Sequence, residues 1–257
     1  MAKKRLLTKR TTKMIIINFL KTIFYYASFL IFMILFTIFN GIIWLVTLPF
    51  DKFRRVTHKL NSSVGYMLMM LNPFWRVKIF GRDKVKKGEA YLITPNHQSL
   101  TDIAILAAMG IDLKWVAKKE LTYIPFLGWV MAMAKDVLLD RKDPKSQFKM
   151  MRSCENFLKN DISIAIFPEG TRSKNGELGR FRDGAALLAR KTGKKIIPVC
   201  MIGNDRSMPE KGFIWTKRVN MEIHFLDPID PADYEKTKEL SNAVKESIQN
   251  KLNESIK

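Results

Sequence analysis

The stretch from Thr22 to Phe50 contains no charged side chain, and it constrains the fold of this 257-residue chain more than any other feature. A helix that crosses a membrane needs roughly 20 consecutive apolar residues, so the stretch is long enough for one crossing. A secretory signal peptide would have a shorter apolar region ending at small residues, whereas this one ends in bulky side chains such as Leu48 and Phe50. The sequence therefore predicts an N-terminal helical membrane anchor that stays attached.

Basic residues flank the apolar stretch on both sides. They are Lys3, Lys4, Arg5, Lys9, Arg10 and Lys13 before it, and Lys52, Arg54, Arg55 and Lys59 after it. Because both flanks are basic, the positive-inside rule gives no single orientation for one crossing. A bend at Asn40-Gly41 would instead allow a hairpin that enters one leaflet, and both forms stay open. In either form we expect the basic remainder on the cytoplasmic side of the inner membrane, where anionic lipid attracts it.

The segment after the anchor is also apolar. Val64–Leu71, followed by Phe74, Trp75 and Arg76, fits an amphipathic helix with aromatic residues at the membrane surface, and it fits a core helix equally well. We place the boundary after this helix. Residues 1–72 then form the basic tail, anchor and interfacial helix, and residues 73–257 form one α/β domain.

From about residue 76 onward, short apolar runs alternate with helical segments. This alternation predicts an α/β fold with a largely parallel sheet covered by helices. The expected strands are Arg76–Phe80, Ala90–Thr94, Leu113–Ala117, Val137–Leu139, Ile162–Phe167, Lys195–Met201 and Asn220–Phe225. The expected helices are Asp102–Met109, Ile124–Ala134, Pro144–Leu158, Gly184–Thr192 and Ala232 to near the C-terminus. Asp143-Pro144 is a strong start signal, an acidic N-cap followed by proline.

Charge and cysteine content narrow the class of partner. A net charge of +20 suits phospholipid headgroups, nucleotide carriers, acidic carrier proteins and nucleic acid. Nucleic acid is not expected, because the sequence shows neither a helix–turn–helix nor basic residues interleaved with aromatics. Cys154 and Cys200 lie far apart in a predicted helix and a predicted strand, so we expect two buried thiols without a disulfide.

The loop Asn96–Asp102 carries the first candidate catalytic residues. Pro95 forces extended backbone before it and stops continuation as a helix, which leaves His97 in a loop at the edge of the sheet. Asp102 opens the next helix, close enough to accept from one imidazole nitrogen while the other faces substrate, which makes His97 a competent general base. Asn96 and Ser99 suit a polar turn that positions His97, and simple turn chemistry fits them as well; we place both among the substrate-binding residues. Ser99 lacks a Gly-x-Ser-x-Gly surround, which disfavours it as a nucleophile.

The loop Phe167–Ser173 carries the second group of candidates. An apolar strand ends there in a proline, an acid, a glycine, a hydroxyl and an arginine. Gly170 permits a close approach of backbone to ligand, and Arg172 can bind a phosphate through two hydrogen bonds. An ordinary surface turn fits these residues as well when they are taken alone.

Taken together, NHQSLTD at 96–102 and FPEGTRS at 167–173 resemble the two signature motifs of the lysophospholipid acyltransferase family. The resemblance covers roughly residues 75–205. It implies His97 as base, Asp102 as its partner, and no metal or cofactor. The resemblance also implies that Glu169, Gly170, Thr171 and Arg172 help to bind a glycerol phosphate.

Further segments extend the resemblance. Lys118, within a family-like basic segment, is implied as a phosphate contact, with the neighbouring Lys119 as a surface charge. Arg141 is implied near the acceptor phosphate, although Lys135 stands where that family block usually opens with glycine. Phe181–Gly184 matches a further family stretch. The apolar segment Tyr123–Trp129 could line an acyl-chain tunnel or pack in the core.

The implied activity is transfer of a fatty acyl group from acyl-CoA or acyl carrier protein to the sn-2 hydroxyl of lysophosphatidic acid, giving phosphatidic acid. The basic set of Lys118, Arg141 and Arg172 favours this acceptor over another lysophospholipid or a lyso-aminolipid. A lipid or thioester hydrolase that uses the same His–Asp pair is the alternative class. The sequence does not choose between the two donors, because both are acidic and suit a basic rim.

Overall fold

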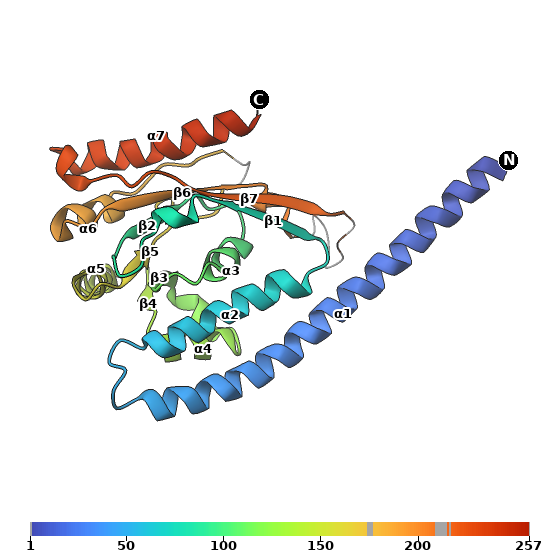
Figure 1. Cartoon of the computed structure of the whole chain (residues 1–257), viewed down its shortest axis with the longest axis horizontal. Coiled ribbons are helices and arrows are strands. Elements are labelled where there is room, and N and C mark those ends of the chain that lie inside the picture. Colours follow the sequence, from blue (N-terminus) through green and yellow to red (C-terminus); the bar gives the residue numbers. More distant parts are fainter. Residues whose placement is uncertain (1, 174–176, 209–214, 216, 257) are drawn as a thin grey trace.

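A computed structural model of the chain describes residues 2–173, 177–208, 215 and 217–256, with side chains from Thr12 to Ser255 within those ranges. One sheet lies between two layers of helices, and a long N-terminal helix extends away from this body (Figure 1). The basic side chains predicted at positions 3–10 lie outside the described side chains.

The sheet has seven strands in the order β1-β7-β6-β2-β5-β3-β4. All neighbouring pairs are parallel except β6 and β7. The expectation of a largely parallel sheet is confirmed, and every predicted strand is present to within a few residues. The observed strands are β1 Trp75–Phe80, β2 Leu92–Pro95, β3 Leu113–Lys118, β4 Val137–Leu139, β5 Ser163–Ala165, β6 Ile196–Ile202 and β7 Val219–Phe225.

Helices cover both faces of the sheet because the central strands are apolar on both sides. In β2, Leu92 packs into one core cluster and Ile93 into the other. One cluster lies under α5 Pro144–Lys159, α6 Gly184–Thr192 and α7 Thr237–Ile256. The other lies toward α2 Arg55–Leu71, α3 Thr101–Ala107 and α4 Leu127–Ala134. Short 3₁₀ turns are η1 Arg82–Lys84, η2 Lys119–Tyr123, η3 Asn204–Arg206 and η4 Pro231–Asp233.

Two helix starts differ from the prediction, and prolines account for both. The helix expected from Ile124 begins at Leu127, since Pro125 lacks a backbone N–H and η2 occupies the preceding residues. The C-terminal helix begins at Thr237, because Asp230 and Pro231 cap the separate turn η4. The start predicted at Asp143 is confirmed, where the side chain accepts from Lys145 N at 2.9 Å.

Helix α1, Ala2–Thr47, is continuous and is not interrupted at Asn40-Gly41. Asn40 is buried and donates to Asn61 of α2 at 3.3 Å, so this polar residue joins two helices instead of interrupting one. Thr12–Thr47 is apolar enough to cross a membrane. At 1.5 Å per residue these 36 residues span about 54 Å, well beyond the roughly 30 Å of a bilayer core.

The chain turns back after α1, and α2 packs beside it (Figure 1). The turn is tied to the sheet by Lys114 of β3, whose side chain is fully buried. Its ammonium donates to Arg54 O at 3.2 Å and to Ala134 O at the end of α4. Burial lowers the pKa of Lys114 to about 8, an effect opposed by the nearby charge of Asp136. The buried side chain of Lys114 thus connects the turn between α1 and α2 to β3 and to the end of α4.

The apolar segment after the anchor has two faces in the structure. Gly65 is buried against α3, and Leu68, Met69 and Leu71 pack on the core. Tyr66 and Met70 of the same helix are exposed. Phe74 and Trp75 are buried, so the alternative that put them at a membrane surface is wrong for these two aromatics. They fill the space between α2 and the edge of the sheet.

Lys135 stands where the related family block usually has glycine, and its backbone conformation explains that preference. It ends α4 with φ of 58° and ψ of 41°, the left-handed conformation that glycine adopts most readily at helix ends. Its ammonium donates to Lys52 O at 3.3 Å, and the residue does not line the cavity described below. The departure therefore alters a turn and adds no charge to that cavity.

Both cysteines are buried and free, as the sequence predicted. Burial raises the pKa of each thiol, Cys154 and Cys200, to about 12. Such thiols stay protonated near neutral pH and are inert as nucleophiles.

Candidate active site

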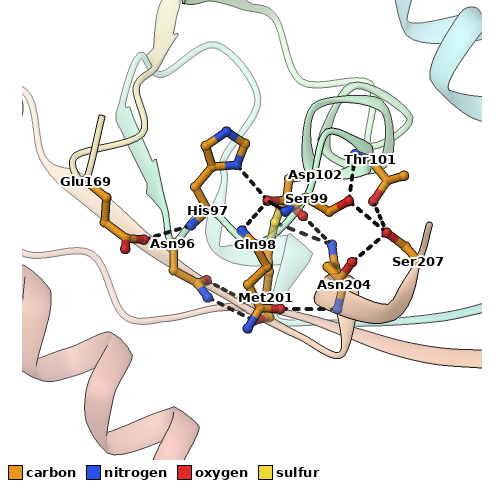
Figure 2. Close-up of polar contacts among 10 residues, drawn as sticks. All are labelled: Asn96, His97, Gln98, Ser99, Thr101, Asp102, Glu169, Met201, Asn204 and Ser207. Atoms are coloured by element: carbon orange, nitrogen blue, oxygen red, sulfur yellow. Dashed lines mark hydrogen bonds and ion pairs between the residues drawn. The ribbon is translucent and has the colours of Figure 1, made fainter. Parts of the chain in front are cut away.

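The candidate site lies where the parallel strands β2 and β5 end, the edge at which α/β proteins place their ligands. The loop after β2 carries His97, and the first turn of α3 carries Asp102. His97 Nδ1 lies 2.8 Å from Asp102 Oδ2. The pairing predicted from the sequence is present in the structure (Figure 2).

Asp102 is fully buried, and four donors converge on its carboxylate. Oδ2 accepts from His97 Nδ1, from Gln98 N at 2.7 Å and from Ser99 N at 2.9 Å. Oδ1 accepts from Asn204 Nδ2 at 2.8 Å. An ionised carboxylate can only accept hydrogen bonds, so this contact selects, for a neutral imidazole, the tautomer with its proton on Nδ1 and a lone pair on Nε2. This tautomer is the one that a general base needs.

The second loop holds His97 in place from the other side. Glu169 Oε1 accepts from His97 N at 2.9 Å, and Ser173 N donates to His97 O at 2.8 Å. The ring of Phe167 stacks on the imidazole with centroids 4.1 Å apart. Motifs that lie far apart in the sequence therefore meet at one residue.

Three residues predicted to bind substrate have side chains turned into the protein. Asn96 pairs with Met201 through N–H and C=O, at 2.7 and 3.0 Å. Ser99 Oγ lies within hydrogen-bond distance of Ser207 Oγ, at 3.0 Å. The second carboxylate oxygen of Glu169, Oε2, accepts from Gly179 N at 2.9 Å. Each is nearly buried, so these side chains shape the loops instead of facing the cavity, which corrects the prediction of direct substrate contact.

A cavity of about 710 Å³ opens beside His97 and contains most of the other predicted residues. Lys118, Arg141, Gly170, Thr171 and Arg172 all line it, while Lys119 does not. Gly170 has φ of 69°, and a Cβ there would lie 3.0 Å from Arg182 Nε, so both conformation and space favour glycine. Apolar side chains complete the wall, among them Leu100, Ile103, Val116, Leu121, Ile124, Leu139, Met150, Met151 and Ile166.

Arg182 is a cavity residue that the sequence analysis did not single out, although its segment matched a family motif. It lines the cavity together with Arg141. The pKa of Arg141 is lowered by burial and by the charge of Arg182, and Glu120 opposes the shift. Two neighbouring guanidinium groups that repel one another favour an anion between them.

The segment Tyr123–Trp129 is divided between the cavity and the outer surface. Ile124 lines the cavity, but Tyr123 is 75% exposed and Trp129 is 57% exposed. Core packing does not describe these two aromatics. Tyr123 precedes the cavity residue Ile124 in the chain, and Trp129 belongs to α4, a helix that contacts α1.

Replacing Glu169 with glutamine should impair catalysis without removing a cavity contact. The amide can accept from only one of His97 N and Gly179 N, which leaves the other donor facing an NH₂ group. A buried unsatisfied donor costs about 1–3 kcal/mol, so we expect a lower unfolding midpoint and about a tenfold loss in kcat. Urea unfolding and acyl-transfer rates check this. Glu239→Gln, at an exposed pair with Lys236, is the matched control, and equal behaviour of the two variants would contradict the assigned role.

The fold and site together define an α/β protein in which a histidine, paired with a buried aspartate, lines a cavity with cationic groups and an apolar wall. Comparison with known proteins identifies the family. Residues 76–202 match the family model described as acyltransferase. The chain belongs to the acyltransferase family, as the two motifs predicted.

Individual relatives agree with this assignment. The chain is 35% identical over 180 residues to the chloroplastic 1-acyl-sn-glycerol-3-phosphate acyltransferase LPAT1 of Arabidopsis thaliana, covering 69% of this chain and 50% of that protein. It is 37% identical over 156 residues to the 1-acyl-sn-glycerol-3-phosphate acyltransferase of Helicobacter pylori, covering 58% and 66%. The chain thus spans about half the length of the plant relative.

A solved structure resembles nearly the whole chain. The crystal structure of the 1-acyl-sn-glycerophosphate (LPA) acyltransferase PlsC from Thermotoga maritima superimposes with a TM-score of 0.76 at 27% identity. The match covers 93% of this chain and 96% of that one, which includes the N-terminal helices as well as the sheet.

Proposed function

We propose that this protein transfers a fatty acyl group from a thioester donor, acyl-CoA or acyl carrier protein, to the sn-2 hydroxyl of lysophosphatidic acid, giving phosphatidic acid. The His97–Asp102 pair at 2.8 Å, placed beside a cationic and apolar cavity, is the observation that carries the proposal. The names of the Arabidopsis and Helicobacter relatives support the same acceptor.

The chemistry follows from the protonation of His97. Its Nε2 accepts the proton of the acceptor hydroxyl as that oxygen bonds to the thioester carbonyl carbon. The resulting imidazolium is stabilised by Asp102, which stays ionised. When the tetrahedral species collapses, the C–S bond breaks and the thiolate leaves with the proton from His97. An ester and a free thiol are formed, and no acyl-enzyme intermediate is required.

The acceptor is assigned by charge. Lys118, Arg141 and Arg172 line the cavity with Arg182, and guanidinium groups bind phosphate through paired, charge-assisted hydrogen bonds. The apolar wall suits fatty acyl chains. A phosphomonoester next to the reacting hydroxyl uses both features, whereas an uncharged monoacylglycerol would leave the cations unpaired.

Membrane attachment is part of the proposal. Large apolar side chains of α1 are exposed along most of its length, including Ile15, Leu20, Phe24, Leu35 and Leu45. Tyr123 and Trp129 extend apolar surface to the cavity, which would let lipid substrates enter from the bilayer. With a net charge of +20, the catalytic part is expected on the cytoplasmic side of the inner membrane.

The acceptor can be tested by measuring transfer from labelled acyl-CoA and from acyl carrier protein to lysophosphatidic acid and to monoacylglycerol in detergent micelles. Wild type should acylate lysophosphatidic acid with at least one donor and use monoacylglycerol poorly. Arg172→Ala should raise KM for lysophosphatidic acid about tenfold to a hundredfold, the value of a lost charge-assisted hydrogen bond. Lys119→Ala, outside the cavity, is the matched control.

Other outcomes would replace parts of the proposal. Equal use of monoacylglycerol would contradict phosphate recognition. Acylation of other lysolipids alone, such as a lyso-aminolipid, would keep the reaction and discard this acceptor. Loss of thioester without any acylated lipid would identify a hydrolase.

A further inference from the structure

We propose that Asn204 is a positioning residue for the catalytic pair, acting through the oxygen of Asp102 that does not face His97. This inference rests on the proposed function, because it assigns a role within that active site. Figure 2 shows Asn204 on the opposite side of Asp102 from the imidazole.

Within the described part of the chain, the contact from Asn204 is the only hydrogen bond to Asp102 Oδ1. Asn204 Nδ2 donates to it at 2.8 Å, while three other donors occupy Oδ2. Asp102 and Asn204 are both fully buried, so no solvent can replace this donor. Without it, one oxygen of a buried carboxylate would be unsatisfied, and the carboxylate could rotate away from His97.

The fold fixes Asn204 independently of Asp102. It follows Gly203, whose φ is 79° and whose added Cβ would lie 2.5 Å from Asn220 O, so β6 must turn sharply there. The backbone N–H and the hydroxyl of Ser207 both donate to Asn204 O, at 3.0 and 2.5 Å. Ser207 O in turn accepts from the indole nitrogens of Trp75 and Trp215 at 2.9 and 2.8 Å. A rigid turn therefore presents the amide.

The backbone of Asn204 makes a second contact with the loop that carries His97, and the side-chain oxygen of Asn204 has no hydrogen-bond partner among the described residues. Asn204 N donates to Gln98 Oε1 at 3.1 Å. Asn204 Oδ1 is buried and has no hydrogen-bond partner among the residues that the structure describes. An aliphatic side chain would avoid that unsatisfied oxygen, so the donor Nδ2 accounts for an asparagine at this position.

Two variants separate positioning from packing. Asn204→Leu fills similar space and donates nothing. Asn204→Asp places a carboxyl group against Asp102, and two carboxyl groups in contact share a proton at the lower end of the pH range. The shared proton can then replace the missing N–H, whereas at higher pH the two charges repel. Asn96→Leu, which removes a buried asparagine whose side chain pairs with the backbone of Met201 and does not contact Asp102, is the matched control.

The test combines kinetics with ¹⁵N NMR of histidine-labelled protein, which reads the tautomer of His97 without turnover. Asn204→Leu should lower kcat about tenfold to a hundredfold, part of what a positioned base contributes, with KM unchanged. Its neutral His97 should lose the Nδ1–H tautomer. The activity of Asn204→Asp relative to wild type should rise as pH falls from 8.5 to 6, whereas the relative activities of Asn204→Leu and Asn96→Leu stay flat.

A wild-type tautomer in Asn204→Leu, or a relative activity of Asn204→Asp that does not change with pH, would overturn the inference. Failure of wild type to acylate lysophosphatidic acid would contradict the proposed function instead. The NMR measurement would still decide whether Asn204 orients the His97–Asp102 pair.

Discussion

Asp102→Asn is expected to lower kcat by about 10³–10⁴-fold while the protein still folds. Four donors surround the carboxylate, three at Oδ2 and one from Asn204 at Oδ1. An amide offers one accepting oxygen, so either orientation turns its NH₂ group toward a donor. If the NH₂ group faces His97, the acceptor for its Nδ1–H is lost; if it faces the other donors, the side chain is displaced. In both cases His97 can take the tautomer with its proton on Nε2, the atom at which a base needs a lone pair.

Kinetic measurement across pH, with circular dichroism to monitor the fold, checks this expectation. Asp227→Asn is a matched isosteric control, because Asp227 is 91% exposed and pairs with Lys84 at 2.7 Å. Surface pairs of this kind contribute only about 0–1 kcal/mol, so activity should not change. If Asp102→Asn retained near wild-type kcat, the pair would not act as a base and its partner.

Gly65→Ala is expected to cause a large loss of stability. Its Cβ would lie 2.1 Å from Ala104 O and 2.9 Å from Ala108 N, both backbone atoms of the α3 segment. Neither atom can move without shifting α3, so α2 and α3 must separate. Overpacking of this kind costs about 1–3 kcal/mol, occasionally more. Because α3 carries Asp102, the shift should also reduce kcat.

Gly41→Ala provides the control within the same helical hairpin. Nothing lies within 4 Å of its added Cβ, and alanine is favoured over glycine inside a helix by about 1 kcal/mol. Thermal unfolding in detergent should therefore show a lower midpoint for Gly65→Ala and an unchanged or higher one for Gly41→Ala. Matching midpoints in the two variants would show that α2 and α3 do not pack as described.

Much of this architecture is local in the sequence. Runs such as Ile162–Phe167 predict strands because β-branched and apolar residues favour buried sheet positions. The ring of Pro95 clashes with the preceding residue unless that residue is extended, so the chain cannot continue there as a helix. The pairing of His97 with Asp102 was also predictable, since a loop residue and the first turn of the next helix lie close together. The strand order, by contrast, depends on long-range contacts that no local pattern encodes.

What the sequence did not predict concerns the direction of side chains and contacts between distant segments. Glu169 was assigned to substrate by the family resemblance, and Ser99 as part of the polar turn around His97. In the structure Glu169 accepts from the backbone N–H of His97, and Ser99 lies against the hydroxyl of Ser207, so both side chains turn inward. Asn204 carries no local signal, because its partner Asp102 is remote in the chain. Asn40 suggested a bend, but its side-chain Nδ2 donates to Asn61 from inside a continuous helix.

The most direct test of the central claim is acyl transfer to lysophosphatidic acid by wild type and by His97→Ala, purified in the same detergent and shown to unfold at similar temperatures. The account predicts phosphatidic acid from wild type and a rate reduced by about 10²–10⁴-fold in His97→Ala, the usual contribution of a general base. Phosphatidic acid formed at the wild-type rate by His97→Ala would contradict it.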